Sequence, residues 1–309
     1  MSFATAELVK RKFEERSTLK LLSFHAADGV RLGISTDAGV VDVRATAETS
    51  GLPAPGSMTE AIKGGDSALE QLAQIRAAAD SALPEPETSH APAVPAPGKL
   101  LCVGANYRRH AQEAGLPLPE QPIYFAKFGN SLAGHREEVV LPAATERGDY
   151  EVELVVVIGE PAHKVSREQA LDHVFGYAVG NDLSARELQM RSSQWLYGKA
   201  IDGFAPLGPY VVTADDVPDP QKLDLKCWVN GELRQDSNTA DMIFSVAELV
   251  SDLSQIMTLQ PGDLIYTGTP EGVILGMQEP QWLQPGDEVT CEVEGLGRLV
   301  TTLVADKSD

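Results

Sequence analysis

The strongest constraint on the fold is a succession of short apolar segments in the last two thirds of the chain, separated by glycine, proline, asparagine and aspartate. Alternating or continuous aliphatic residues between such turn residues are typical of β-strands. The segments are KLLCVGANY, PIYFAKF, EVVLP, ELVVVIG, GYAVGND, GPYVVTA, LDLKCWVNGEL, DLIYTGTP, EVTCEVEGLG and RLVTTLVA. Helical patterns are few, at about 107–114, 166–173 and 245–257. The sequence therefore predicts a β-dominated α+β fold and argues against a Rossmann fold or a barrel.

The first part of the chain has its own pattern of elements. The strand-like segments LKLLSF, VRLGIST and VVDVR are separated by glycine-containing turns, and a helical pattern runs from about Met58 to Ala82. Residues 4–16 are typical of a charged helix. The proline-rich stretch 83–98 indicates a linker or an extended crossover. We therefore expect a small N-terminal α+β domain over 1–97 and a larger domain over 98–309.

Charge and composition exclude several classes of partner. The net charge is −20, from 45 acidic and 25 basic residues, which argues against nucleic acid or an anionic membrane as the main partner. No apolar run approaches the ~20 residues of a membrane span, and the first residues lack the apolar region of a signal peptide. Cys102, Cys227 and Cys291 are far apart, so we expect buried, unreactive thiols in a reducing cytoplasm.

The stretch DYEVELVVVIG carries two carboxylates that need an explanation. Glu151 and Glu153 are two positions apart, so in a strand both point from the same face and repel each other. A divalent cation would turn that repulsion into coordination, and Asp182, at the end of the apolar segment GYAVGND, would be a third ligand. Carboxylates without histidine or cysteine favour Mg²⁺ or Mn²⁺ over zinc. The alternative is a solvated strand end, with Asp182 capping a helix.

A second group of residues could act on a substrate. In a helix, His110 and Glu113 are i,i+3 neighbours, and a carboxylate that orients imidazole makes it a better base. A surface pair without function is the alternative. Lys199 lies among apolar residues, so either its head reaches water while its stem packs, or it is held at an anionic intermediate.

Three further residues could bind an anionic substrate. Arg186 and Gln189, one turn apart, could hold a substrate carboxylate or could form a structural pair. Thr269, in the glycine-rich stretch YTGTPEGV, could donate to an anion, although no lysine follows it as in a phosphate-binding loop.

Together these stretches resemble one known family. The order CVGANYRRHAQE, PIYFAKF, DYEVELVVVIG, FGYAVGNDLSARELQ, GKAIDGFAPLGP, VNGELRQ, DMIFSVAELV and MTLQPGDLIYTGTPEGV is similar to that of the fumarylacetoacetate hydrolase family, and more narrowly of its acylpyruvate-hydrolase-like branch. The resemblance covers nearly all of 98–304, and 19–97 resemble the small N-terminal domain of many members. It implies a twisted mixed β-sheet roll and a homodimer.

The resemblance also implies roles for the residues named above. It places Mg²⁺ or Mn²⁺ on the three carboxylates, a catalytic dyad of His110 and Glu113 on a lid segment, and Lys199 as an active-site lysine. The positions that match Arg186, Gln189 and Thr269 hold the carboxylate end of a substrate in the family. Ala105 and Gly203 depart from residues common there, which leaves the identity of the substrate open.

The implied reaction is the hydrolysis of a small 2,4-dioxo acid. Water activated by His110 would attack the C4 carbonyl, and the C3–C4 bond would break to leave a pyruvate enolate, with Lys199 stabilising the negative charge. Decarboxylation of oxaloacetate or isomerisation of a dienoic diacid on the same site is the alternative, because family members do all of these. A non-catalytic scaffold is the alternative from a different class.

Overall fold

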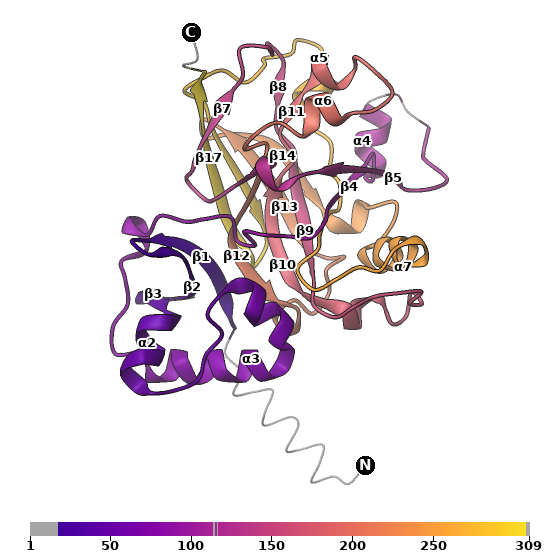
Figure 1. Ribbon diagram of the computed structural model, residues 1–309. Helices are drawn as coiled ribbons and strands as arrows, with labels where there is room; N and C mark the ends of the chain where they lie inside the picture. The colour runs from indigo at the N-terminus through magenta and orange to yellow at the C-terminus, as the bar shows by residue number, and fades with distance from the viewer. Residues whose placement is uncertain (1–17, 114, 116, 307–309) are drawn as a thin grey trace.

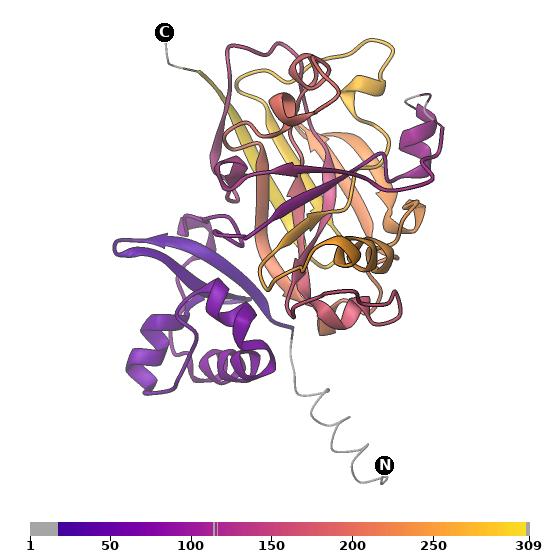
Figure 2. The same ribbon diagram turned by 45° about the vertical axis from the view of Figure 1, so that its right-hand side comes forward.

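The computed structural model describes residues 18–113, 115 and 117–306, so the helix expected over 4–16 lies outside the described residues. Two β-sheets form the centre of the described chain, and α4, α5 and α6 gather at the end of the sheets far from α3 (Figures 1 and 2). The β-dominated α+β architecture expected from the sequence is confirmed, with a small α+β region at its N-terminal end.

The larger sheet has ten strands and includes the strands of the N-terminal region. In spatial order it contains β3 (Gly39–Asp42), β2 (Gly29–Thr36), β1 (Lys20–Ala26), β12 (Ala205–Thr213), β10 (Val174–Asn181), β9 (Val152–Ile158), β15 (Leu264–Tyr266), β4 (Leu100–Gly104) and β5 (Ile123–Lys127), with β6 (Leu132–Ala133) paired to β12. Strand β1 pairs antiparallel with β12, with Leu21 opposite Val211. The N-terminal strands therefore continue the sheet of the larger region.

The second sheet has five strands and faces the first. Its order is β14 (Glu232–Asn238), β13 (Asp224–Val229), β16 (Glu288–Val293), β17 (Gly297–Ala305) and β7 (Glu138–Leu141), and β8 (Gly148–Asp149) and β11 (Ser184–Ala185) form a separate two-stranded pair. The turn between β13 and β14 is Asn230-Gly231, with φ values of 51° and 81°. Positive φ at both positions is what a two-residue hairpin turn requires. The hairpin indicated by Asn230-Gly231 is confirmed.

Strand β9 is buried on both of its faces. Leu154 and Val156 belong to the core shared with the five-stranded sheet. Val155 and Val157 pack on the other side, in a cluster that includes Leu72 of helix α3 (Met58–Ala78). A strand covered on both sides has no solvent face and needs no polar alternation, which explains its aliphatic sequence. The strand is a firm support for the residues at its start.

The helices confirm most of the expected helical segments. They are α2 (Val43–Ser50), α3, α4 (Arg108–Glu113), α5 (Arg186–Gln189), α6 (Leu196–Lys199) and α7 (Val246–Ile256), with 3₁₀ turns η1 (Glu85–Glu87), η2 (Gly129–Ser131), η3 (Ala170–His173), η4 (Ala214–Asp216), η5 (Thr239–Asp241) and η6 (Ile274–Gly276). The segment 166–173 forms only η3. The strand expected for VVDVR was also wrong at its end, because Asp42 accepts a hydrogen bond from Ala45 N at 3.1 Å and begins α2.

The proline-rich stretch 83–98 lies against the larger sheet. Leu83 and Val40 exchange two backbone hydrogen bonds, of 2.8 and 2.9 Å, and Ala93 N donates to Leu207 O at 3.1 Å. These bonds join the stretch to strands of both regions. Of the two interpretations of this stretch, the structure supports the extended crossover.

The three cysteines are buried and free, as expected from the sequence. Cys227 and Cys291 face each other across β13 and β16, with a distance of 4.0 Å between their sulfur atoms. Burial raises the pKa of Cys102 and of Cys227 well above the ordinary thiol value. The neutral thiol is a poor nucleophile, so these cysteines act as small apolar side chains.

Two histidine rings meet where the proline-rich stretch contacts the larger region. His90 and His135 are arranged edge to face, with ring centroids 5.0 Å apart. The Nδ1 atom of His135 accepts a hydrogen bond from Val300 N at 3.1 Å. Burial, together with the charges of His90 and Arg136, lowers the pKa of His135 to about 3. The ring must be neutral, because a proton on Nδ1 would put two donors face to face.

Acid is expected to destabilise the protein through His135. The unfolded chain binds a proton at this residue below pH 6.5 and the folded chain only near pH 3, so the stabilisation is present above pH 6.5 and is lost as the pH falls. Between pH 7 and pH 5 the loss amounts to about 2 kcal/mol. His135→Asn keeps an acceptor for Val300 without titrating, so its unfolding free energy in urea should fall less steeply with acid. Equal pH slopes for the two proteins would contradict this account.

Candidate metal centre and active site

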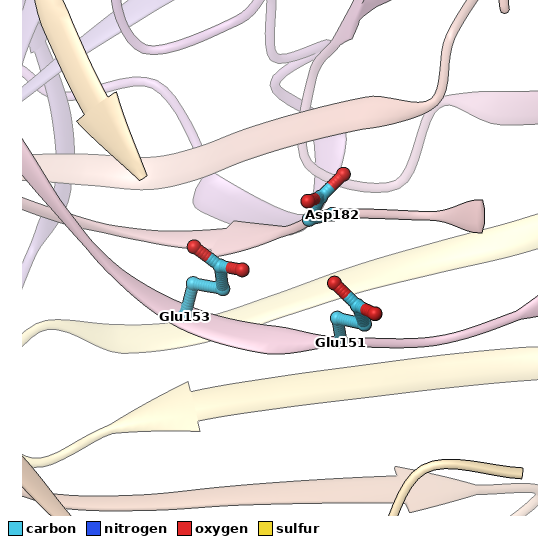
Figure 3. Close-up of side chains that lie close together, drawn as sticks. All are labelled: Glu151, Glu153 and Asp182. Atoms are coloured by element: carbon cyan, nitrogen blue, oxygen red, sulfur yellow. The ribbon is translucent and has the colours of Figure 1, made fainter. Parts of the chain in front are cut away.

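Three carboxylates meet where β9 begins and β10 ends. Antiparallel pairing sets Glu153 opposite Gly180, and Asp182 N donates to Glu151 O at 2.9 Å. The side chains of Glu151, Glu153 and Asp182 point toward one another (Figure 3), and one oxygen from each lies within 4.8 Å of the others. The most exposed of the three, Glu151, is only 6% exposed. The structure thus brings together the residues that the sequence singled out, and it buries them, contrary to the alternative of a solvated strand end.

Glu153 is the least compensated of the three carboxylates. Its Oε2 atom accepts a hydrogen bond from Gly268 N at 2.8 Å. It forms no ion pair with any residue in the described part of the chain. Burial raises the pKa of Glu153 well above its ordinary value, and the charges of Asp182 and Glu151 raise it further. A bound cation would reverse these effects by supplying the missing opposite charge.

Glu151 and Asp182 share a buried lysine. The ammonium group of Lys199 lies 2.8 Å from Glu151 Oε2 and 2.8 Å from Asp182 Oδ2. Lys199 is only 2% exposed, so the interpretation that its head reaches water is wrong. The Lys199 charge, with Arg186, holds the pKa of Glu151 at about 2, against the burial that would raise it.

Each carboxylate of the triad has one oxygen held by a donor from the protein scaffold. Arg186 Nη2 lies 2.7 Å from Glu151 Oε1, and Lys127 Nζ contacts Asp182 Oδ1. Gly268 N donates a hydrogen bond to Glu153 Oε2. Among the described residues, the second oxygens of Glu151 and Asp182 contact the ammonium group of Lys199. A cation at this point would therefore meet carboxylates that are already fixed in orientation, and three hard oxygen ligands fit Mg²⁺ or Mn²⁺.

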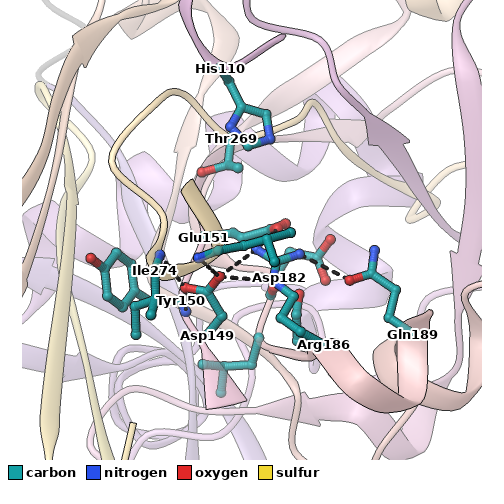
Figure 4. Close-up of polar contacts among 12 residues, drawn as sticks. His110, Asp149, Tyr150, Glu151, Asp182, Arg186, Gln189, Thr269 and Ile274 are labelled. Atoms are coloured by element: carbon teal, nitrogen blue, oxygen red, sulfur yellow. Dashed lines mark hydrogen bonds and ion pairs between the residues drawn. The ribbon is translucent and has the colours of Figure 1, made fainter. Parts of the chain in front are cut away.

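The predicted dyad lies on helix α4 above the carboxylates. His110 Nδ1 is 3.6 Å from Glu113 Oε2, so the two residues face each other as the i,i+3 spacing predicted. Both carboxylate oxygens of Glu113 accept a hydrogen bond from Gly272 N, at 3.1 Å. Figure 4 shows His110 and Thr269 on the same side of Glu151. The helix thus places an imidazole on the Thr269 side of Glu151, with Nδ1 as the ring nitrogen nearest to Glu113.

The proposed substrate-binding residues have protein partners in this structure. Arg186 Nη1 donates to Gln189 Oε1 at 3.0 Å, and the rest of the guanidinium contacts Asp149 and Glu151 (Figure 4). The two residues therefore form the structural pair that was one of the two interpretations. Thr269 Oγ1 accepts a hydrogen bond from Gln235 Nε2 at 2.9 Å, which leaves the hydroxyl hydrogen to donate to a ligand. Contact with a substrate stays a prediction for all three.

Sequence reasoning missed two buried charged residues of this site. Lys127 is 1% exposed, and its ammonium group contacts Asp182, Leu183 O and Phe204 O. Its position in the apolar stretch IYFAKF is the same feature that drew attention to Lys199. Asp149 is fully buried and lies two residues before Glu151, so the spacing that paired the glutamates extends to it.

The family model described as the C-terminal region of fumarylacetoacetate (FAA) hydrolase matches residues 99–304. The oxaloacetate tautomerase FAHD2A of Homo sapiens, a mitochondrial protein, is 40% identical over 301 residues, which cover 96% of this chain and 95% of the relative. No helix among the described residues is long and apolar enough to span a membrane.

Two solved structures support the same assignment. Fumarylacetoacetate hydrolase from Exiguobacterium antarcticum is 34% identical, with a TM-score of 0.78 over 93% of this chain and 100% of that one. Maleylpyruvate hydrolase from Sphingobium sp. SYK-6, in complex with manganese(II) and pyruvate, is 32% identical, with a TM-score of 0.77 over 93% and 100%. Enzymes therefore occur among the proteins similar to this chain. By sequence and by fold, the chain belongs to the fumarylacetoacetate hydrolase family.

Proposed function

We propose that the protein is a divalent-metal-dependent enzyme that interconverts the enol and keto forms of oxaloacetate. The observation that carries the proposal is the buried triad: each carboxylate has one oxygen held by a donor from the protein, and one oxygen from each carboxylate lies within 4.8 Å of the others. The identity of 40% with an oxaloacetate tautomerase over nearly the whole of both chains supports the choice of substrate.

The residues of the site suit the transfer of a proton on a small 2-oxo acid. Glu151, Glu153 and Asp182 would hold Mg²⁺ or Mn²⁺, which would supply a Lewis acid for the oxygens of the substrate. Tautomerisation moves one proton between C3 and the C2 oxygen. His110 Nε2 would take or return that proton, since Nδ1 faces Glu113. Lys199 would stabilise negative charge on the C2 oxygen with an ammonium group already fixed beside two of the carboxylates.

Hydrolysis of an acylpyruvate is the second candidate. The His110–Glu113 pair that suits proton transfer also suits activation of a water molecule, and the similarity to a maleylpyruvate hydrolase supports this reading. The two reactions differ in their products, because hydrolysis consumes water and releases pyruvate, whereas tautomerisation releases nothing. Decarboxylation of oxaloacetate would release pyruvate and CO₂.

The products decide between these reactions. Crystalline enol-oxaloacetate would be dissolved with the protein and Mn²⁺, and formation of the keto form would be followed with a dehydrogenase that accepts only that form. We expect the protein to accelerate ketonisation above the rate with Mn²⁺ alone, and EDTA to abolish the effect. Pyruvate would be assayed in parallel with oxaloacetate, acetylpyruvate and fumarylpyruvate. Faster pyruvate release from an acylpyruvate would favour the hydrolase, and no turnover of any substrate would favour a scaffold.

Two expectations from the sequence complete the proposal. The family resemblance predicts a homodimer, and the free, buried cysteines predict a reducing compartment such as the cytoplasm. The human relative, in contrast, is named as a mitochondrial protein. The compartment of this protein stays a prediction.

A further inference from the structure

Asp149 is a buried carboxylate whose hydrogen-bonding capacity is used within the protein. It accepts hydrogen bonds from Tyr150 N and Ile274 N at 2.9 Å, from Leu275 N at 3.0 Å and from Arg186 Nε at 2.8 Å (Figure 4). Arg186 Nη2 is a further contact at 2.8 Å. With these donors around it, Asp149 has no lone pair left for a metal ion or a substrate. Asp149 can therefore influence the site only through the side chain and the backbone amides that donate to it.

On one side, Asp149 acts on the triad through a single side chain. The Nη2 atom of Arg186 contacts both Asp149 Oδ2 and Glu151 Oε1, at 2.8 and 2.7 Å. The guanidinium group is only 5% exposed in its side chain and is planar, so its orientation is set by the partners on its edges. The position of the Glu151 carboxylate therefore depends on the carboxylate of Asp149.

On the other side, Asp149 holds the loop 272–276. Its oxygens receive the first free amides of η6, Ile274 N and Leu275 N, and its neighbour Tyr150 donates its hydroxyl group to Gly272 O at 2.9 Å. Asp149, at the end of β8, and Tyr150 after it thus hold this loop at Gly272, Ile274 and Leu275.

The loop 272–276 also contacts Glu113 of the dyad. Gly272 N donates to both oxygens of Glu113, at 3.1 Å. A Cβ atom at Gly276 would lie 2.5 Å from Glu113 Cδ, so Glu113 packs directly on the backbone of the loop. Glu113 in turn faces His110. A displacement of the loop would therefore move the carboxylate that orients the imidazole.

We propose that Asp149 is a positioning residue that couples the metal triad to the dyad. Through Arg186 it sets Glu151, and through the loop 272–276 it sets Glu113, so that occupation of the triad by a cation and ordering of the loop favour each other. The proposal rests on the metal site and the dyad of the proposed function. Coupling between two sites is reciprocal, and a factor of about 5 to 150 is typical.

Amide hydrogen exchange in the full-length protein tests the coupling without any substrate. In the wild type, saturating Mn²⁺ is expected to slow exchange at Gly272, Ile274 and Leu275 by about fivefold or more. In Asp149→Asn the amide nitrogen of the new side chain would face protein donors, so the Mn²⁺-induced slowing at Gly272 should disappear. The Kd for Mn²⁺, measured by calorimetry, should rise by about the same factor.

Asp263→Asn is the matched control. Asp263 is also fully buried and accepts hydrogen bonds from Lys99 N and Gln260 N, both at 2.8 Å, but it lies at the far end of β9, where Ile158 N donates to Asp263 O. The control should lose stability and keep the Mn²⁺-induced slowing at Gly272. Retention of that slowing in Asp149→Asn would overturn the proposal.

The wild type alone also decides the matter if Asp149→Asn does not fold. Mn²⁺ binding that leaves exchange in the loop 272–276 unchanged would overturn the coupling and leave the proposed function intact. Failure of the wild type to bind Mn²⁺ would overturn the metal site on which both rest. Mn²⁺-dependent slowing without tautomerase activity would support the coupling and contradict only the proposed reaction.

Discussion

Glu153→Gln is expected to abolish metal binding and, at the same time, to stabilise the metal-free protein. Glutamine keeps an acceptor for Gly268 N but removes a charge that no residue in the described chain pairs with. Loss of a direct ligand should weaken Mn²⁺ binding by more than about 100-fold, since even partners of ligands are worth 10- to 100-fold. Removal of a buried like charge beside Glu151 and Asp182 should add about 1 kcal/mol to the unfolding free energy in EDTA. Calorimetric titration and thermal unfolding measure the two effects.

The same substitution at the other end of the strand is the control. Glu160 follows β9 and is exposed, so Glu160→Gln should change neither the Mn²⁺ affinity nor the Tm measured in EDTA. A fall in Tm for Glu153→Gln, of the size seen on loss of a stabilising contact, would show that Glu153 is compensated without a metal ion. Unaltered Mn²⁺ binding would remove Glu153 from the metal site.

Lys199→Met is expected to separate metal binding from catalysis. The ammonium group lies on the two oxygens of Glu151 and Asp182 that a cation would use, so its removal should lower the Kd for Mn²⁺ by about tenfold, or 1.4 kcal/mol. Ketonisation of enol-oxaloacetate should nevertheless slow by a factor of about 10²–10³, the usual cost of losing one donor to a developing negative charge. Calorimetry with Mn²⁺ and the coupled ketonisation assay give the two values.

Lys127→Met is the matched comparison, because the two lysines contact opposite oxygens of Asp182. Lys127 also donates to Leu183 O and Phe204 O, so its removal leaves three buried acceptors without a donor. Breaking such a buried pair costs about 3–5 kcal/mol of stability. The loss should be the same with and without Mn²⁺, whereas Lys199→Met should lose stability mainly in EDTA. Unchanged Mn²⁺ affinity in Lys199→Met would contradict the sharing of oxygens.

Much of the site follows from local sequence rules. The spacing of Glu151 and Glu153 sets both on one strand face, and the stop of an apolar strand before Asp182 sets the third carboxylate at a strand end. Both rules depend only on residues close in sequence, and the structure confirms the cluster. The facing of His110 and Glu113 follows in the same way from the period of one short helix.

The residues that were missed depend on contacts distant in sequence. Asp149 accepts a hydrogen bond from Ile274 N, 125 positions later, and Lys127 donates one to Phe204 O, 77 positions later. No pattern within a window of ten residues contains such partners. The fold shows the same limit at α2: the alternation in VVDVR suits a strand, and only the capping carboxylate of Asp42 indicates that a helix begins there.

The continuation of the large sheet into the N-terminal region has a consequence for solubility. The second half of β12 is covered by β1, and the cluster beneath it includes Leu207 and Val211 together with Leu21. Without β1, unpaired backbone groups of β12 would lie open at a sheet edge next to apolar side chains, which is a template for association with other chains. We therefore expect the N-terminal strands to protect this sheet, which carries the metal site, from aggregation. This role requires no contact with the substrate.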